Sequence, residues 1–163
     1  MRDELNFYIN GEWVESDSSE TIEVVNPANE EIIGHVTAGS KQDINSAVMA
    51  ANEAFKLFSQ TSKNERIAYL EAIIKEYENR YQDFVDTITL EMGAPTWLSN
   101  RAQASTGIKN FNETLDALKI YEFEKPEGDY LLRKEPIGVI GMITPWNWPM
   151  NQITTKVSAA IAS

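Results

Sequence analysis

The chain contains no cysteine, a single histidine and few basic residues. The lack of cysteine excludes a disulfide framework and a cysteine-ligated metal site, and His35 has no second histidine with which to share a metal. Lysine plus arginine number 14 against 25 acidic residues, a net charge of −11. Because an acidic chain repels phosphate backbones and anionic lipid, we expect neither nucleic acid nor a membrane surface as partner.

Long apolar runs are missing as well. The longest, residues 137–143, is far shorter than the roughly 20 residues needed to span a bilayer. The stretch 1–14 is polar and lacks the apolar region of a secretory signal. Composition is ordinary for a folded chain, with 42% hydrophobic and 24% charged residues in 163. We therefore expect a soluble, cytoplasmic protein of about one domain.

Three β-hairpins are predicted from strand-like runs that flank turn residues. Asn10-Gly11 is a strong hairpin signal because both residues tolerate positive φ. The second turn, 26–29, combines proline with two asparagines, and the third, 126–129, contains Gly128. The paired runs are 7–9 with 12–14, 21–25 with 31–36, and 120–124 with 130–135.

Three helical stretches lie between the second and third hairpins. Ser40 with Asp43, and Ser62 with Glu65, form capping-box patterns at two helix starts. The second stretch is long enough to break near Asn79, and 93–95 end it and open a third. The apolar positions of the first and third stretches are Ile44, Ala47, Val48, Ala51, Phe55 and Phe58, and Trp97, Ala104, Ile108, Phe111, Leu115 and Leu118. Together the three stretches predict a helical layer.

The last stretch, 136–163, predicts a buried strand, a sharp turn and a helix. Residues 137–143 are apolar on both faces, which is typical of a strand covered on both sides, and Thr144-Pro145 ends it. Apolar residues then recur at helical spacing from Met150. Asn147 falls at the carboxyl end of the strand, where open α/β sheets bind ligands.

The motif P-I-G-V-I-G-M-I-T-P-W-N-W-P at 136–149 is similar to the signature that opens the cofactor domain of aldehyde dehydrogenases. The stretches F-Y-I-N-G-E-W-V, V-N-P-A-N-E-E-I-I-G-H-V and L-E-M-G-A-P extend the resemblance back to the N-terminus. It implies an α/β chain, the N-terminal portion of that fold. Residues 1–119 would be hairpins and helices of the cofactor domain, 120–135 a protruding hairpin that makes a homo-oligomer, and 136–163 a truncated first strand-turn-helix of a Rossmann-like domain.

The resemblance also implies NAD- or NADP-dependent oxidation of a small aldehyde to a carboxylic acid through a cysteine thiohemiacetal. The family's cysteine nucleophile, glutamate base and glycine motif lie beyond the matched part, so we expect the chain alone to be inactive. One alternative is a non-catalytic interaction module whose hairpins pair with a partner. Another is a helical scaffold without a ligand. Oligomeric state would help to separate the module from the others.

Asn147 has two compatible interpretations. Asparagine is a preferred helix N-cap, which the spacing alone favours. Its NH₂ group can also donate to an oxyanion, the role that the resemblance implies. The tryptophans on either side are explained by packing or, from the resemblance, by the mouth of a substrate pocket. The family's cofactor wall matches Ile143, Thr144, Pro145, Trp146 and Asn147, and its substrate pocket matches Trp146, Trp148, Gln152 and Thr155.

Two charged residues complete the candidate site. Lys156 lies one helical turn after Gln152, so both share a face. It is either a solvated lysine or, from the resemblance, a residue with a proton-transfer or structural role beside the catalytic site. Glu91 is either a surface carboxylate near a helix end or the acidic position that the family places near a monovalent cation.

Overall fold

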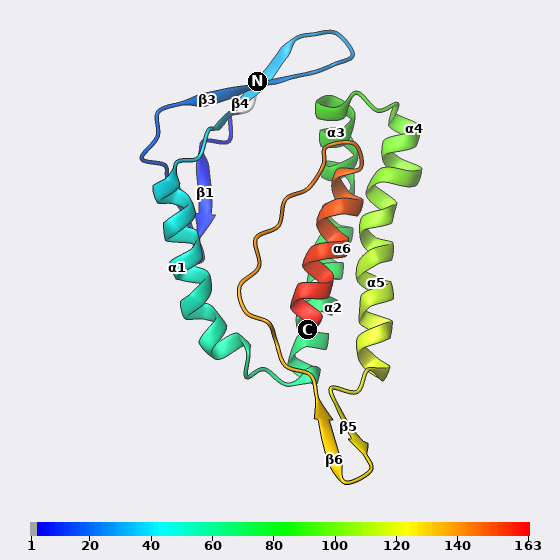
Figure 1. Ribbon diagram of the computed structural model, residues 1–163. Helices are drawn as coiled ribbons and strands as arrows, with labels where there is room; N and C mark the ends of the chain where they lie inside the picture. The colour runs from blue at the N-terminus through cyan, green and yellow to red at the C-terminus, as the bar shows by residue number, and fades with distance from the viewer. Residues whose placement is uncertain (1–2) are drawn as a thin grey trace.

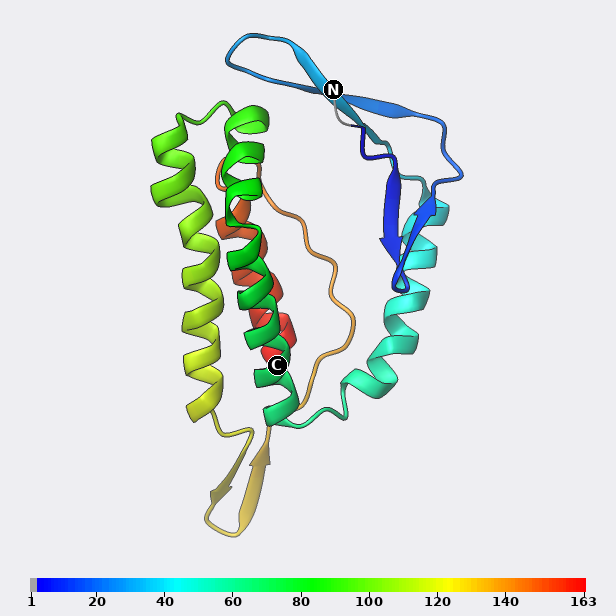
Figure 2. The same ribbon diagram turned by 180° about the vertical axis from the view of Figure 1, so that it is seen from behind.

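Four helices form a layer in the computed structural model, which describes residues 3–163 (Figure 1). They are α2 (Lys63–Asn79), α3 (Tyr81–Met92), α5 (Ser105–Ile120) and α6 (Pro149–Ala162). A short α4 (Thr96–Leu98) and a π-helical stretch, η1 (Ser99–Ala104), lead into α5. A further helix, α1 (Lys41–Phe58), lies apart from the layer, and the segment 134–148 runs between them in both views (Figures 1 and 2). None of the described helices is long and apolar enough to cross a membrane.

The two N-terminal hairpins are confirmed. They pair β1 (Asn6–Ile9) with β2 (Glu12–Glu15), and β3 (Thr21–Val25) with β4 (Ile32–Thr37). Asn10 and Gly11 have φ values of 55° and 82°, which match the turn that a two-residue hairpin loop requires. His35 in β4 contacts Asp3, whose Oδ1 lies 3.0 Å from its Nδ1, so the histidine helps to attach the N-terminal segment to this hairpin.

Both predicted capping boxes are present. At α1, the Ser40 side chain accepts from backbone N–H groups of the first turn, and Asp43 Oδ2 accepts from Ser40 N at 2.8 Å. At α2, Ser62 and Glu65 make the same reciprocal bonds, with Ser62 N donating to Glu65 Oε2 at 2.8 Å. The predicted break is also confirmed, because α2 ends and α3 begins at Arg80.

We expect the α2 capping box to depend on pH. Hydrogen bonds from the Ser62 backbone N–H, and then from its hydroxyl, hold the pKa of Glu65 below the ordinary value of 4.5. A carboxylate with a lowered pKa stabilises the fold fully above its unfolded pKa, and this contribution is lost as the pH falls through the lowered value. Helix content measured by circular dichroism from pH 6 to pH 2 should therefore fall more steeply in the parent chain than in Glu65→Gln. The glutamine amide oxygen still accepts the Ser62 hydrogen bonds but does not titrate. Superimposable curves for the two proteins would contradict this.

The core lies where α2, α5 and α6 meet. Its buried residues are Leu70, Ile74, Tyr77, Phe111, Leu115, Leu118 and Ala162. The face of α6 that packs on α5 is small and partly polar. Asn110 Nδ2 donates to Thr154 Oγ1 at 2.9 Å, and the hydroxyls of Thr114 and Ser158 lie 2.8 Å apart. These bonds satisfy the polar groups that the close packing of the two helices buries.

The prediction that all three helical stretches share one layer is wrong for α1. No α1 residue is buried, and Ile44 on its apolar stripe is 63% exposed. Only the C-terminal end of the stripe contacts the layer, where Phe58 stacks on Tyr69 of α2 with ring centroids 6.1 Å apart. Trp97, predicted to face inward, is likewise 65% exposed. It lies in the single turn of α4, before the α5 face that the periodicity describes.

The predicted buried strand at 137–143 is also wrong. The segment has no regular structure, and Ile137 and Ile143 are 91% and 93% exposed. Its backbone makes no hydrogen bond within residues 3–163. A strand requires a neighbouring strand for its N–H and C=O groups, and the described part of the chain places none beside it. The strand-turn-helix unit expected for 136–163 is therefore reduced to a turn and a helix.

The third hairpin is present, but its first strand lies later in the chain than the predicted 120–124, and Pro126 and Glu127, predicted for the turn, belong to that strand. It pairs β5 (Glu124–Glu127) with β6 (Tyr130–Arg133) around a turn in which Gly128 has φ 64°. Ile120, expected to begin the first strand, is instead the last residue of α5. The hairpin projects from the helical layer, and every residue of β6 is exposed (Figure 1).

Candidate functional site

The turn 144–148 connects the exposed segment to α6 and carries the central candidate residue. Helix α6 begins at Pro149, its N-cap is Trp148, and no side chain caps it. The N-cap interpretation of Asn147 is therefore wrong. Proline at the first helical position needs no partner for an N–H, so this helix start depends less on a capping side chain.

Asn147 is exposed on this turn, and its side-chain amide makes no hydrogen bond within residues 3–163. Its backbone carbonyl accepts from Gln103 Nε2 at 3.3 Å. Trp146 on one side is 80% exposed, whereas Trp148 on the other is half-buried. The structure thus holds the backbone of Asn147 and leaves its carboxamide available to a ligand.

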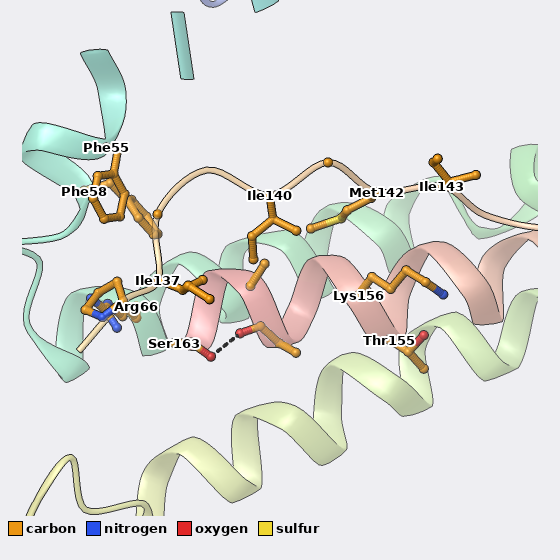
Figure 3. Close-up of a pocket in the computed structure, with 15 residues that line it drawn as sticks. Phe55, Phe58, Arg66, Ile137, Ile140, Met142, Ile143, Thr155, Lys156 and Ser163 are labelled. Carbon is orange, nitrogen blue, oxygen red and sulfur yellow. Dashed lines mark hydrogen bonds between the residues drawn. The ribbon is translucent and has the colours of Figure 1, made fainter. Parts of the chain in front are cut away.

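A cavity of about 580 Å³ lies between α1, the segment 137–143 and α6, and no residue of the turn 144–148 lines it. Figure 3 shows Phe55 and Phe58 at one end, with Lys156 and Ile143 toward the other. Thr155 lines the same cavity. This cavity brings together three of the predicted site residues in mainly apolar surroundings.

A second cavity of about 570 Å³ lies between α3 and the turn. Its lining includes Thr144, Pro145 and Trp146 from the predicted cofactor wall, together with Glu91 from the last turn of α3. The structure therefore does not bring the predicted residues together: Ile143, Thr155 and Lys156 line the first cavity, and Thr144, Pro145, Trp146 and Glu91 line the second. Asn147, Trp148 and Gln152 line neither of these two cavities. Within the described residues, no three acidic or histidine side chains gather as ligands of a metal ion. The assignment of Glu91 to a cation stays a prediction.

Lys156 and Gln152 share one face of α6, as their spacing predicts. Lys156 Nζ donates to Gln152 Oε1 at 2.9 Å and to the Gln152 carbonyl at 3.2 Å. These bonds orient the ammonium along the helix and leave it half-buried. Thr155 is exposed, and its hydroxyl donates to the Asn151 carbonyl at 2.8 Å.

Gln103 is a site-supporting residue that sequence reasoning missed. It lies in η1, is 1% exposed and contacts the turn through Asn147. In the sequence it is an amide next to Ala104 within a helical pattern, and glutamine is usually exposed. It is buried because η1 packs against α3, α5 and α6, which are distant contacts that the local sequence does not signal.

Comparison with known proteins gives consistent matches. The model of the aldehyde dehydrogenase family matches residues 13–163. Over all 163 residues the chain is 55% identical to a Staphylococcus aureus (strain bovine RF122 / ET3-1) protein named "Putative aldehyde dehydrogenase", and 54% identical to its counterpart in strain USA300. The chain spans 34% of the length of each of these relatives.

Solved structures agree with the sequence matches. An aldehyde dehydrogenase of Bartonella henselae superposes with a TM-score of 0.96 at 38% identity, over 99% of this chain and 35% of that one. A cysteine-to-alanine mutant of Pseudomonas syringae aldehyde dehydrogenase C, in complex with NAD⁺ and octanal, gives 0.94 at 41% identity, over 96% and 32%. The arrangement of helices and small antiparallel sheets is therefore shared with these proteins.

Proposed function

Because this chain belongs to the aldehyde dehydrogenase family, we propose that it is the N-terminal third of an NAD(P)-dependent enzyme that oxidises an aldehyde to a carboxylic acid. The observation that carries the proposal is the carboxamide of Asn147, which makes no hydrogen bond within residues 3–163 and lies on an exposed turn whose residues 144–146 line a cavity against α3. Its NH₂ group donates to the oxyanion that forms when a nucleophile attacks the aldehyde carbonyl.

The residues present fit one wall of a nicotinamide-cofactor site. The backbone of 143–146 is exposed and makes no hydrogen bond within the described part of the chain, so its donors and acceptors are available. Ile143, Thr144, Pro145, Trp146 and Asn147 would line that wall. When bound, the cofactor supplies the hydride acceptor. NAD⁺ in the Pseudomonas syringae structure supports NAD as the cofactor here.

Polar and aromatic side chains around the turn would act on the substrate side. Trp146 and Trp148 offer aromatic surface, and Gln152 and Thr155 offer polar groups one and two turns into α6. Lys156 brings a positive charge to the cavity of Figure 3, held by Gln152 at 2.9 Å. We assign it to proton transfer or to local electrostatic support. Octanal in the Pseudomonas syringae complex makes an aliphatic aldehyde a suitable first substrate to test.

The chain alone should not turn over aldehyde, because it contains no cysteine to serve as the nucleophile. The test is a chimera in which these 163 residues replace the aligned third of the USA300 relative. We expect the chimera to reduce NAD⁺ or NADP⁺ when octanal is added. The 163-residue chain should reduce neither cofactor. Turnover by the chain alone, or none by a folded chimera while the intact relative is active, would refute the proposal.

The third hairpin supports assembly into a homo-oligomer. Tyr130, Leu131 and Leu132 in β6 are 70%, 56% and 47% exposed, an apolar strand edge that favours pairing with another subunit. The same feature favours the alternative function, a non-catalytic interaction module. The two functions differ in whether the chimera oxidises aldehyde.

We expect Leu131→Lys to lower the oligomeric state of the chimera, because a charge on the exposed strand opposes apolar pairing. Sedimentation velocity of the parent and the variant measures this. The matched control is Leu57→Lys, which charges an 80% exposed leucine of α1 outside the hairpin. Equal sedimentation of all three proteins as oligomers would exclude the hairpin as the contact.

A further inference from the structure

Gln103 is buried in the π-helical stretch η1 and reaches the proposed catalytic turn. Its side chain is 1% exposed, and its Nε2 donates to the backbone carbonyl of Asn147 at 3.3 Å. The residues joined by this bond are 44 positions apart in the sequence. The carbonyl belongs to the same residue whose carboxamide is the proposed oxyanion donor, so the bond acts directly on that residue's backbone.

Packing alone does not explain an amide at this position. Gln103 Oε1 is buried and has no hydrogen-bond partner within residues 3–163. A buried acceptor left unpaired costs about 1–3 kcal/mol, whereas an apolar side chain of similar length would avoid that cost. What glutamine provides here, and methionine would not, is the donor to Asn147. Glutamine at position 103 therefore destabilises the fold through its unpaired Oε1, while its Nε2 contacts the proposed site.

Tyrosine side chains of the neighbouring helices hold η1, the stretch that carries Gln103, in place. Tyr77 Oη donates to the carbonyl of Ala104 at 2.8 Å, and Tyr81 Oη donates to the carbonyl of Asn100. Burial raises the pKa of Tyr77, so its hydroxyl stays protonated and keeps donating. Two tyrosines from α2 and α3 thus hold both ends of η1, a π-helical stretch of the kind often found at functional sites.

The turn lacks such support of its own. Residues 144–147 are exposed and irregular, and Trp148, the N-cap, has no side-chain cap bond. The hydrogen bond from Gln103 therefore ties the backbone of the turn at Asn147 to the helical layer. A displacement of about 1 Å in a reacting geometry can reduce turnover roughly 100-fold.

We propose that Gln103 is a positioning residue that holds the Asn147 backbone so that its carboxamide meets the oxyanion. This inference rests on the proposed function, because it requires Asn147 to be the donor. Gln103 touches neither substrate nor cofactor, and it acts only through Asn147.

The test compares Gln103→Met with Asn110→Ala in the chimera. Methionine keeps the length and loses the donor. Asn110→Ala removes hydrogen bonds to Thr154 and Asn151 in α6, which loosens the helix without touching Asn147. We expect Gln103→Met to lower kcat by about 10- to 100-fold with little change in KM for octanal and no loss in melting temperature. Asn110→Ala should lower the melting temperature and keep kcat within about threefold, a margin under 1 kcal/mol of transition-state energy.

Crystal structures of both variants give a readout independent of activity, because only Gln103→Met should move the Asn147 side chain. An unchanged kcat in Gln103→Met, while Asn147→Ala loses about 10²–10³-fold in kcat, would overturn this inference alone. An equal loss of kcat in Asn110→Ala would also overturn it, since general loosening would then explain the effect. If Asn147→Ala itself keeps full turnover, the proposed role of Asn147 fails and this inference fails with it.

Discussion

Asn147→Ala in the chimera is expected to lower kcat for aldehyde oxidation by about 10²–10³-fold, which corresponds to about 2.7–4 kcal/mol of lost transition-state stabilisation. The reason is that the carboxamide makes no other hydrogen bond within residues 3–163, so its removal takes away the donor and little else. KM should change much less, because the oxyanion forms only after the nucleophile attacks.

The measurement is steady-state reduction of NAD⁺ with octanal, together with the melting temperature of each variant. Asn151→Ala is the matched control, since it removes an amide four residues later whose Oδ1 accepts from Asn110 rather than facing the turn. It should keep kcat near that of the parent. A loss of less than about fivefold in Asn147→Ala, under 1 kcal/mol, would be too small for an oxyanion donor.

Gly107→Ala is expected to destabilise the chain by about 1–3 kcal/mol. A Cβ at this position of α5 would overlap the Tyr77 hydroxyl and lie 2.7 Å from its Cζ. Alanine gains about 1 kcal/mol of helix propensity over glycine, but overpacking a core typically costs 1–3 kcal/mol. The displaced ring would also lose its bond to Ala104, worth about 1 kcal/mol, so the clash outweighs the propensity.

Tyr77 has little freedom to move aside. Its ring stacks on Phe84 with centroids 4.3 Å apart and meets Phe111 edge-on at 6.5 Å. Urea denaturation of the 163-residue chain measures the loss, and Tyr77→Phe in combination with Gly107→Ala should cost less than the sum of the two changes, because the nearest clashing atom is then absent. Exact additivity, or a stabilising Gly107→Ala, would show that the ring relaxes freely.

Local structure could be predicted where neighbouring residues determine it. The positive φ values of Asn10 and Gly11 follow from residues that tolerate them, and the capping boxes at Ser40 and Ser62 form between groups three residues apart. The left-handed Gly93, with φ 69°, likewise ends α3 where the sequence places it. The family could also be predicted without the structure, because the signature at 136–149 is recognised from the order of its residues alone.

The sequence by itself determined the hairpin turns, the helix starts and the family, since these depend on groups close together in the chain. Only the tertiary structure decided which faces are buried. Residues 137–143 have the pattern of a buried strand but no neighbour, so they stay exposed, and α6 buries Thr154 and Ser158 because Asn110 and Thr114 satisfy their hydroxyls. The contact of Gln103 with Asn147 belongs to the same class, because burial and hydrogen bonding between distant segments are properties of packing rather than of local pattern.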